Sequence, residues 1–319
     1  MTLPSKQRRP LISVIIISYN MAREIPRTVQ SFLPPYQLAV GYEDIEIIVM
    51  ENGSSHPVDP EVVKAWPSCV RYVKVVNPNP SPAMALNEGV AMSRGDWVCP
   101  VIDGARMVTP GIFKHAHDMI KAHDNPVIAT MGYHLGHKIQ QHNVLEGYNQ
   151  DAEDALLDSI GWPNNPYDLF KISSLGGSAR GSWLTQIAES NVLVLKKSFY
   201  ETLGGFDEKF DIPGGGLVNL DFFKRAIDHE DSLYVMLADE GSFHQYHGGV
   251  TTSRAVNLPS IENAEKTTWQ IYAEQYLAIR GEAYQPSKTF PIIYGVMNHI
   301  VREQTINAAL AIHALRTKT

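Results

Sequence analysis

Residues 11–20 read Leu-Ile-Ser-Val-Ile-Ile-Ile-Ser-Tyr-Asn, an apolar run rich in β-branched residues that ends in three polar ones. A run of this length and composition is typical of a strand buried on both faces of a parallel sheet. Basic residues precede it, as in a secretory signal, but no small-residue cleavage site follows it. We therefore expect this run to be the first strand of the fold.

Strand-like and helix-like patterns alternate along the chain that follows. Their alternation predicts βαβ units and an α/β fold with a mostly parallel sheet flanked by helices. Ligands of such sheets bind beyond the carboxyl ends of the strands. Two further helices are expected within residues 256–319. The other expected strands are at 44–50, 70–76, 96–102, 127–131, 191–195 and 233–237, and the expected helices are at 26–33, 81–93, 110–122, 197–203 and 219–229.

Composition narrows the class of protein. The chain has 319 residues, 44% of them hydrophobic, and a formal net charge of −7, which disfavours a surface that coats nucleic acid. No apolar run is long enough to span a membrane, so we expect peripheral membrane contact at most. Two cysteines, Cys69 and Cys99, exclude a disulfide framework and a thiolate zinc cluster, and they favour a cytoplasmic location.

Five short motifs follow one another in a fixed order: SYN at 18–20, ENGS at 51–54, NEGVAMSRGDW at 87–97, VIDGA at 101–105 and GGFDE at 204–208. In this order they resemble the family-2 glycosyltransferases with a GT-A fold, over about residues 11–250. The resemblance implies a Rossmann-like GT-A domain, which we place at residues 1–255. It does not cover residues 256–319, where the amphipathic spacing predicts a helical extension. Within the domain the periodic pattern dissolves over 133–183, where we expect a lid or acceptor loop.

The resemblance also implies where the sugar donor binds. The first two strand ends hold the nucleotide, with Tyr19 on the base and Glu51 accepting a hydrogen bond from uracil N3–H. Asn87 belongs to the set or forms a helix-surface pair with Glu88, and both interpretations stay open. The implied nucleotide-binding residues are Ser18, Tyr19, Asn20, Glu51, Asn52, Asn87 and Asp103.

Asp103 is the expected metal ligand. The family usually has Asp-x-Asp here, whereas this chain reads Asp-Gly-Ala, so the second carboxylate is missing. His244 or His247, on an expected loop, could complete a shell for Mn²⁺ or Mg²⁺. Arg106 could replace part of the positive charge, although its pattern favours a surface arginine. Whether a metal is required stays open.

The catalytic base departs from the family pattern. Asn219 aligns with the base aspartate of inverting enzymes, and an amide cannot serve as a base. Asp221 is the nearest carboxylate, either lining the active site or paired with Arg225 at i,i+4. Stereochemistry therefore stays open. Asp207 and Trp183 are the expected acceptor residues, although Trp183 could instead anchor the lid.

The sequence thus predicts a metal-assisted hexosyltransferase that moves a sugar from a nucleotide donor, preferably UDP-linked, to a hydroxyl of a glycan or glycoside. A non-catalytic nucleotide- or sugar-binding module of the same fold is the alternative. A nucleotidyltransferase is disfavoured, because residues 19–23 lack the glycine-rich loop that such enzymes need. The C-terminal helices are candidates for a homo-oligomer contact.

Overall fold

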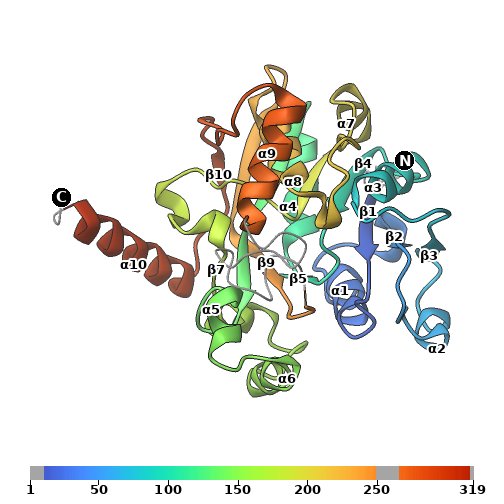
Figure 1. Cartoon of the computed structure of the whole chain (residues 1–319). Coiled ribbons are helices and arrows are strands. Elements are labelled where there is room, and N and C mark those ends of the chain that lie inside the picture. The colour runs from blue at the N-terminus through green and yellow to red at the C-terminus, as the bar shows by residue number, and fades with distance from the viewer. Residues whose placement is uncertain (1–10, 249–265, 317–319) are drawn as a thin grey trace, which may run out of the picture.

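The computed structural model describes residues 11–248 and 266–316, in which ten strands form one sheet flanked by helices (Figure 1). Most neighbours are parallel, and the short β8 joins the two parallel halves by antiparallel pairing with β4 and β6. The predicted α/β fold with a mostly parallel sheet is confirmed. The strand order is β10 (Ile292–Tyr294), β9 (Leu233–His244), β6 (Pro126–Leu135), β8 (Leu193–Lys196), β4 (Trp97–Val101), β1 (Ile12–Ser18), β2 (Ile45–Glu51) and β3 (Val70–Lys74), with β5 (Arg106–Val108) on β9 and β7 (Ser173–Leu175) on β6.

The helices cover both faces of this sheet. They are α1 (Glu24–Phe32), α2 (Pro60–Lys64), α3 (Ala83–Ala91), α4 (Ile112–Ala122), α5 (Gln140–Leu145), α6 (Gln150–Ser159), α7 (Lys197–Thr202), α8 (Val218–Asp228), α9 (Thr268–Arg280) and α10 (His299–Arg316). Short 3-10 turns lie at Tyr42–Asp44, Pro166–Ile172, Gly177–Ala179, Ser182–Leu184 and Pro213–Gly215.

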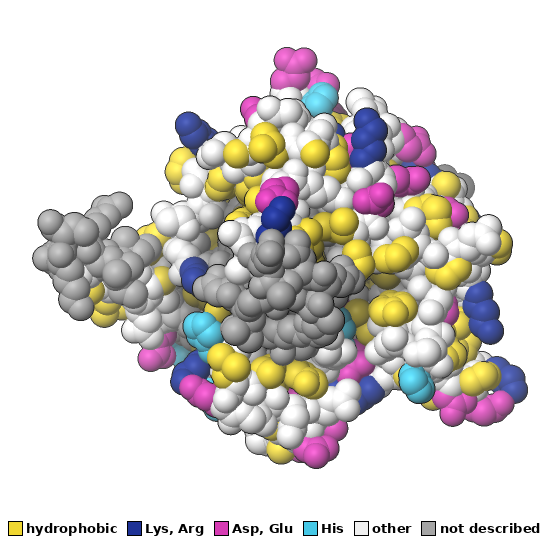
Figure 2. Space-filling model, in the orientation of Figure 1, with side chains coloured by type: hydrophobic (Ala, Val, Ile, Leu, Met, Phe, Trp, Pro, Cys, Tyr) yellow, Lys and Arg dark blue, Asp and Glu magenta, His cyan; other side chains and the backbone are white. Residues whose placement is uncertain are grey.

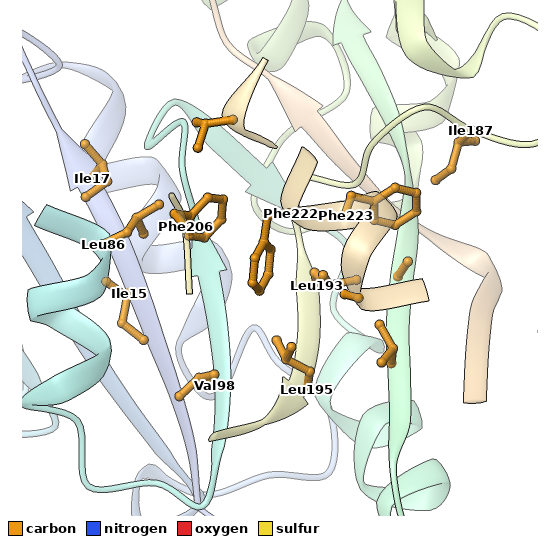
Figure 3. Close-up of a cluster of buried hydrophobic side chains, with 14 of the residues drawn as sticks. Ile15, Ile17, Leu86, Val98, Ile187, Leu193, Leu195, Phe206, Phe222 and Phe223 are labelled. Atoms are coloured by element: carbon orange, nitrogen blue, oxygen red, sulfur yellow. The ribbon is translucent and has the colours of Figure 1, made fainter. Parts of the chain in front are cut away.

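The apolar run of β1 is uninterrupted because both of its faces are buried. Ile15 and Ile17 lie in one core cluster, with Leu86 of α3 and Phe222 of α8 (Figure 3). Ile12, Val14 and Ile16 lie in the other, packed with side chains of α1 and α4. Alternate residues of a strand point to opposite faces, so covering both faces requires an apolar residue at nearly every position.

The structure extends the predictions in three places. The strand expected to end at 237 continues through His244, because its last three residues pair with β5, which the sequence did not predict. The segment 133–183 was expected to be irregular, but it contains the end of β6, α5, α6 and β7. The helix expected to open at Pro26 begins two residues earlier.

The C-terminal part contains the two predicted helices and one unpredicted strand. β10 extends the sheet by pairing with β9, and α10 projects away from the body (Figure 1). Ile306 and Leu310 of α10 are more than half exposed. The division into a domain at 1–255 and an extension at 256–319 stays a prediction, as does a homo-oligomer through these helices.

A bulge in β9 buries a carboxylate beside the sheet. The register of β9 on β6 shifts between Leu237 and Gly241, and Glu240 lies in the shifted stretch. Its carboxylate accepts hydrogen bonds from the amide of Gly111 at 3.0 Å and the hydroxyl of Tyr167 at 2.8 Å. Burial raises the pKa of Glu240 to about 7.

We predict that Glu240→Gln flattens part of the pH dependence of stability. A carboxyl whose pKa is raised by folding contributes stability below its usual value near 4.5, and that contribution is lost as pH rises through about 7. Between pH 5 and pH 8 the wild type should lose on the order of 2 kcal/mol relative to the variant. Urea unfolding at both pH values measures this difference. Exposed Glu61→Gln is the control, and parallel pH profiles for wild type and Glu240→Gln would contradict the prediction.

Candidate functional site

Polar side chains from three parallel strands meet at one edge of the sheet. Ser18, the last residue of β1, lies opposite Glu51, the last residue of β2. β4 runs parallel to β1, and Asp103 follows its end by two residues. The structure therefore brings the three sequence-predicted strand ends to the same edge, where ligands of such sheets bind.

Asp103, His244 and His247 form a compact cluster at this edge. Nε2 of His244 lies 2.8 Å from Oδ2 of Asp103, and Nε2 of His247 lies 3.5 Å from Oδ1. The two imidazole nitrogens lie 3.1 Å apart. The structure thus places together the three residues that the sequence named as metal ligands. His244 ends a strand, so the loop expected for it was wrong.

Short-range packing fixes the backbone under this cluster. A Cβ at Gly104 would lie 1.9 Å from the carbonyl oxygen of Ile17, so the close approach of the two chains requires glycine. The hydroxyl of Thr28 in α1 donates to the carbonyl of Gly104 at 2.6 Å. The next peptide is held as well, because the amide of Gln245 donates to the carbonyl of Ala105 at 2.8 Å.

Arg106 is buried beside Asp103, so its interpretation as a surface arginine was wrong. Its Nε lies 3.4 Å from Oδ2 of Asp103. β5 pairs antiparallel with β9, and the register places Arg106 opposite His244. A strand of three residues therefore brings a permanent positive charge into the cluster.

Burial and mutual attraction set the protonation of the cluster. Burial alone would raise the pKa of Asp103, but His244, His247 and Arg106 hold it well below its usual range. Burial lowers the pKa of His244 to about 4, against the opposing pull of Asp103. At neutral pH these directions give an anionic carboxylate and a neutral imidazole. Those are the forms in which both side chains bind metal ions.

The chemistry of the donor set fits a divalent cation. One carboxylate and two imidazole nitrogens converge from two segments, as ligands of Mn²⁺-type ions do. Nδ1 of His244 is buried without a hydrogen-bond partner among the described residues, so no protein acceptor there fixes which nitrogen is protonated. Nε2, which lies 2.8 Å from Oδ2 of Asp103, is the nitrogen that faces the other candidate ligands.

Glu153 of α6 forms a hydrogen bond with the backbone next to His247. The carboxylate of Glu153 accepts a hydrogen bond from the amide of Tyr246 at 2.7 Å. Arg23 bridges the same carboxylate at 3.3 Å and Asp154 at 2.6 Å. Burial raises the pKa of Glu153 to about 7. Part of the segment 133–183 therefore holds the residue that precedes His247, and α6 lies at that end of the sheet (Figure 1).

Glu51 and Tyr19, the residues predicted to bind the nucleoside, differ in burial and in the number of their hydrogen bonds. The carboxylate of Glu51 accepts from the hydroxyls of Ser18 at 3.1 Å and Tyr72 at 2.5 Å and from the amide of Ser54 at 2.9 Å. The ring of Tyr19 is 55% exposed, which leaves it open to a flat ligand.

Asn20 and Asn52 lie beside the ends of β1 and β2, next to Tyr19 and Glu51. Asn20 has a positive φ of 53°, and its side-chain oxygen accepts from the hydroxyl of Ser55 at 3.0 Å. The amide of Asn52 donates to the carbonyl of Asn79 at 2.8 Å, and its Oδ1 is buried without a partner among the described residues. Both asparagines therefore brace turns at the edge of the predicted nucleotide site.

Asn87 serves the GGFDE turn. Its Nδ2 donates to the carbonyl of Phe206 and to Glu208, both at 2.9 Å. Its Oδ1 accepts from the hydroxyl of Tyr200 at 2.6 Å and from the amide of Phe206 at 3.0 Å. The amide is fully used in holding this turn, so we do not include Asn87 in the proposed nucleotide site.

Two arginines form ion pairs with the carboxylate of Asp221. Its carboxylate, 3% exposed, accepts from Nε of Arg225 at 2.8 Å and from Nε and Nη2 of Arg280 at 2.7 and 2.8 Å. Arg280 also pairs with Asp207 at 2.8 Å. Burial would raise the pKa of Asp207, but the amide of Lys209 and Arg280 lower it below its usual range.

Asp207, Arg225 and Arg280 border a cleft of about 450 Å³ beside the GGFDE turn. Sequence reasoning missed Arg280, because it lies 59 residues from Asp221 in the C-terminal part, outside the motif resemblance. A larger cleft of about 940 Å³ includes Asp96 and Trp97, at the opposite edge of the sheet from Asp103. The volume of a cleft therefore does not identify the candidate functional site in this protein.

Asn219 contacts a carboxylate that the sequence did not single out. Its Nδ2 donates to Oε2 of Glu189 at 2.6 Å and lies 3.5 Å from Oδ1 of Asn191. Trp183 is half-buried against the core, and its indole N–H has no hydrogen-bond partner among the described residues. Its assignment to the acceptor stays a prediction.

The surface and the helices add two general observations. Figure 2 shows acidic and basic side chains scattered over this face, with no continuous basic surface. Across residues 11–248 and 266–316, none of the helices combines the length and the apolar character needed to cross a membrane.

Part of the chain matches a known protein family. Residues 13–103 match the family model described as glycosyl transferase family 2. This match covers less than half of the chain, and with the fold matches that follow it confirms the predicted resemblance to the family-2 glycosyltransferases and their GT-A fold. No curated protein sequence matches the chain.

Solved structures of S. aureus TarS share this fold. Its structure over residues 1–349 aligns with a TM-score of 0.50 and 12% identity, covering 94% of this chain and 72% of that one. The TarS 1–349 complex with UDP-GlcNAc aligns with a TM-score of 0.50 and 13% identity, covering 84% and 66%. A longer TarS chain also gives 0.50 and 13%, covering 75% of this chain but only 37% of its own length.

We predict that Arg280→Met destabilises the protein by about 3 kcal/mol, because it leaves the buried Asp221 carboxylate with one arginine fewer. Lys266→Met is the matched control, since the exposed pair of Lys266 with Glu274 should contribute less than about 1 kcal/mol. Urea unfolding of both variants at pH 7 measures the losses. Equal losses would mean that Arg280 makes only a surface contact.

Proposed function

We propose that the protein is a glycosyltransferase that moves a sugar, a hexose in the first instance, from a UDP-linked donor to a hydroxyl of a glycan or glycoside. The proposal is carried by the cluster of Asp103, His244 and His247 at the edge where β1, β2 and β4 end. TarS, whose fold the chain shares, has been solved with UDP-GlcNAc, which supports a UDP-linked donor.

Asp103, His244 and His247 would hold Mn²⁺ or Mg²⁺, and the two imidazoles favour Mn²⁺. A bound divalent ion neutralises the charge that develops on the diphosphate as the glycosidic bond breaks. Arg106 adds a fixed positive charge 3.4 Å from Asp103. The chain's own residues would thus share the work of stabilising the leaving group.

The nucleoside would lie on the wall formed by the ends of β1 and β2. The exposed ring of Tyr19 would stack on the base, and Glu51, fixed by Ser18 and Ser54, would orient it through the remaining lone pairs. Asn20 and Asn52 would hold the turns around it.

The acceptor would enter beside Asp207, on the side of the cleft bordered by Arg280. Trp183 would contribute an aromatic face, and residues 133–183 would cover the bound substrates. We propose a cytosolic location on the basis of two free cysteines, Cys69 and Cys99.

A non-catalytic nucleotide- or sugar-binding module is favoured by one specific observation. The position expected for the base holds the amide of Asn219, and the neighbouring Asp221 is committed to two arginines. Such a module would bind the nucleotide without breaking the glycosidic bond. UDP release from a UDP-sugar separates the two functions.

We predict that UDP raises the melting temperature by a few degrees in the presence of Mn²⁺, and by less without it. Asp103→Asn should abolish the Mn²⁺-dependent part, because it removes the anionic ligand. Asp96→Asn is the matched control, since Asp96 precedes β4 and lies at the opposite edge. A thermal-shift titration of UDP and GDP measures the effect. No shift with either nucleotide would refute the proposed donor site.

A further inference from the structure

The proposed reaction needs a proton acceptor that the motifs do not supply. An acceptor hydroxyl becomes a competent nucleophile when a carboxylate beside it takes its proton. The inference that follows rests on the proposed function and concerns which residue of this chain performs that step.

The two carboxylates on the acceptor side are already paired. Asp221 is buried between Arg225 and Arg280, and Asp207 is paired with Arg280. Both oxygens of Asp221 already accept hydrogen bonds from arginine N–H groups, and Oδ2 of Asp207 accepts one from Arg280. Both residues are better suited to holding Arg280 of α9 in place than to acting as a base.

Glu189 lies at the correct edge of the sheet. It precedes β8, which runs antiparallel to β4, so the residues before β8 lie beyond the end of β4. Asp103 also follows the end of β4. The neighbouring Ser190 is bonded through its hydroxyl to the backbone of Thr130 in β6, which fixes the chain there.

The carboxylate of Glu189 is held by an amide and not by a cation. Oε2 accepts from Nδ2 of Asn219 at 2.6 Å, and the side chain is only half-buried. Among the described residues, no lysine, arginine or histidine pairs with it. One carboxylate oxygen is thus fixed in place, while the other has no hydrogen-bond partner in the described part of the chain.

We propose that Glu189 is the general base for the acceptor and that Asn219 is its positioning residue. The acceptor O–H gives its proton to Glu189 as the acceptor oxygen forms a bond to the anomeric carbon. The bond from that carbon to the diphosphate oxygen breaks, and its electron pair leaves with the nucleoside diphosphate. A displacement of this kind inverts the anomeric configuration.

The test uses the full chain, Mn²⁺ and a panel of UDP-GlcNAc, UDP-glucose and UDP-galactose, with water as the acceptor probe. Glu189→Gln should lower the rate of UDP release at least about 100-fold, because an amide cannot take the proton. UDP binding by thermal shift should be unchanged, since glutamine can still accept from Asn219. Glu201→Gln, on α7 at the opposite cleft, is the matched loss of a carboxylate.

A second variant separates a base from a merely structural residue. The azide ion attacks without losing a proton and so needs no base. Sodium azide should therefore restore UDP release by Glu189→Ala and give a glycosyl azide of inverted configuration. UDP release by Glu189→Gln at the wild-type rate, or no rescue of Glu189→Ala by azide, would overturn the inference while leaving UDP binding intact. UDP binding by the wild type without any UDP release would overturn it in favour of the binding module. Absence of UDP binding by the wild type would refute the proposed function itself.

Discussion

The short antiparallel ladder between β5 and β9 is the interaction on which the candidate site depends. It joins residues 106–108 to residues 242–244, and so connects the end of β4 to the end of the longest strand of the sheet. Asp103 and His244 lie 141 positions apart in the sequence, yet this ladder holds their side chains 2.8 Å apart. The glycine at 104 permits the approach, because any side chain there would collide with the backbone of β1.

A second set of long-range contacts borders the cleft beside the GGFDE turn. Arg280, at the end of α9, reaches the GGFDE turn through Asp207 and the start of α8 through Asp221. Beneath this ion network the rings of Phe206 and Phe222 stack with centroids 4.3 Å apart. Ion pairs of Arg280 therefore attach the C-terminal part to the cleft, and apolar rings pack beneath them. Deleting the C-terminal part would expose the buried carboxylate of Asp221.

The strand ends could be predicted because each polar motif comes at the end of a buried apolar run, as Glu51 ends β2 and Asp103 follows β4. Arg106 could not be predicted, since its burial depends on a strand of three residues, too short to produce a periodic signal. Arg280 and Glu189 were missed for a related reason. Their partners, Asp221 and Asn219, lie 59 and 30 residues away, and such contacts leave no mark in local spacing.

The departure from Asp-x-Asp is best understood as a change in the charge of the site. Ala105, where the second aspartate would stand, is fully buried in an apolar cluster, and an unpaired carboxylate there would be strongly destabilising. Arg106 and His247 lie beside Asp103 instead. Two aspartates with a divalent ion would sum to a neutral centre, whereas one aspartate, one arginine and the same ion leave it positive. A diphosphate leaving group is a polyanion, so in the proposed reaction this substitution would make the site more attractive to it and would reduce the share of the neutralisation that a metal must supply.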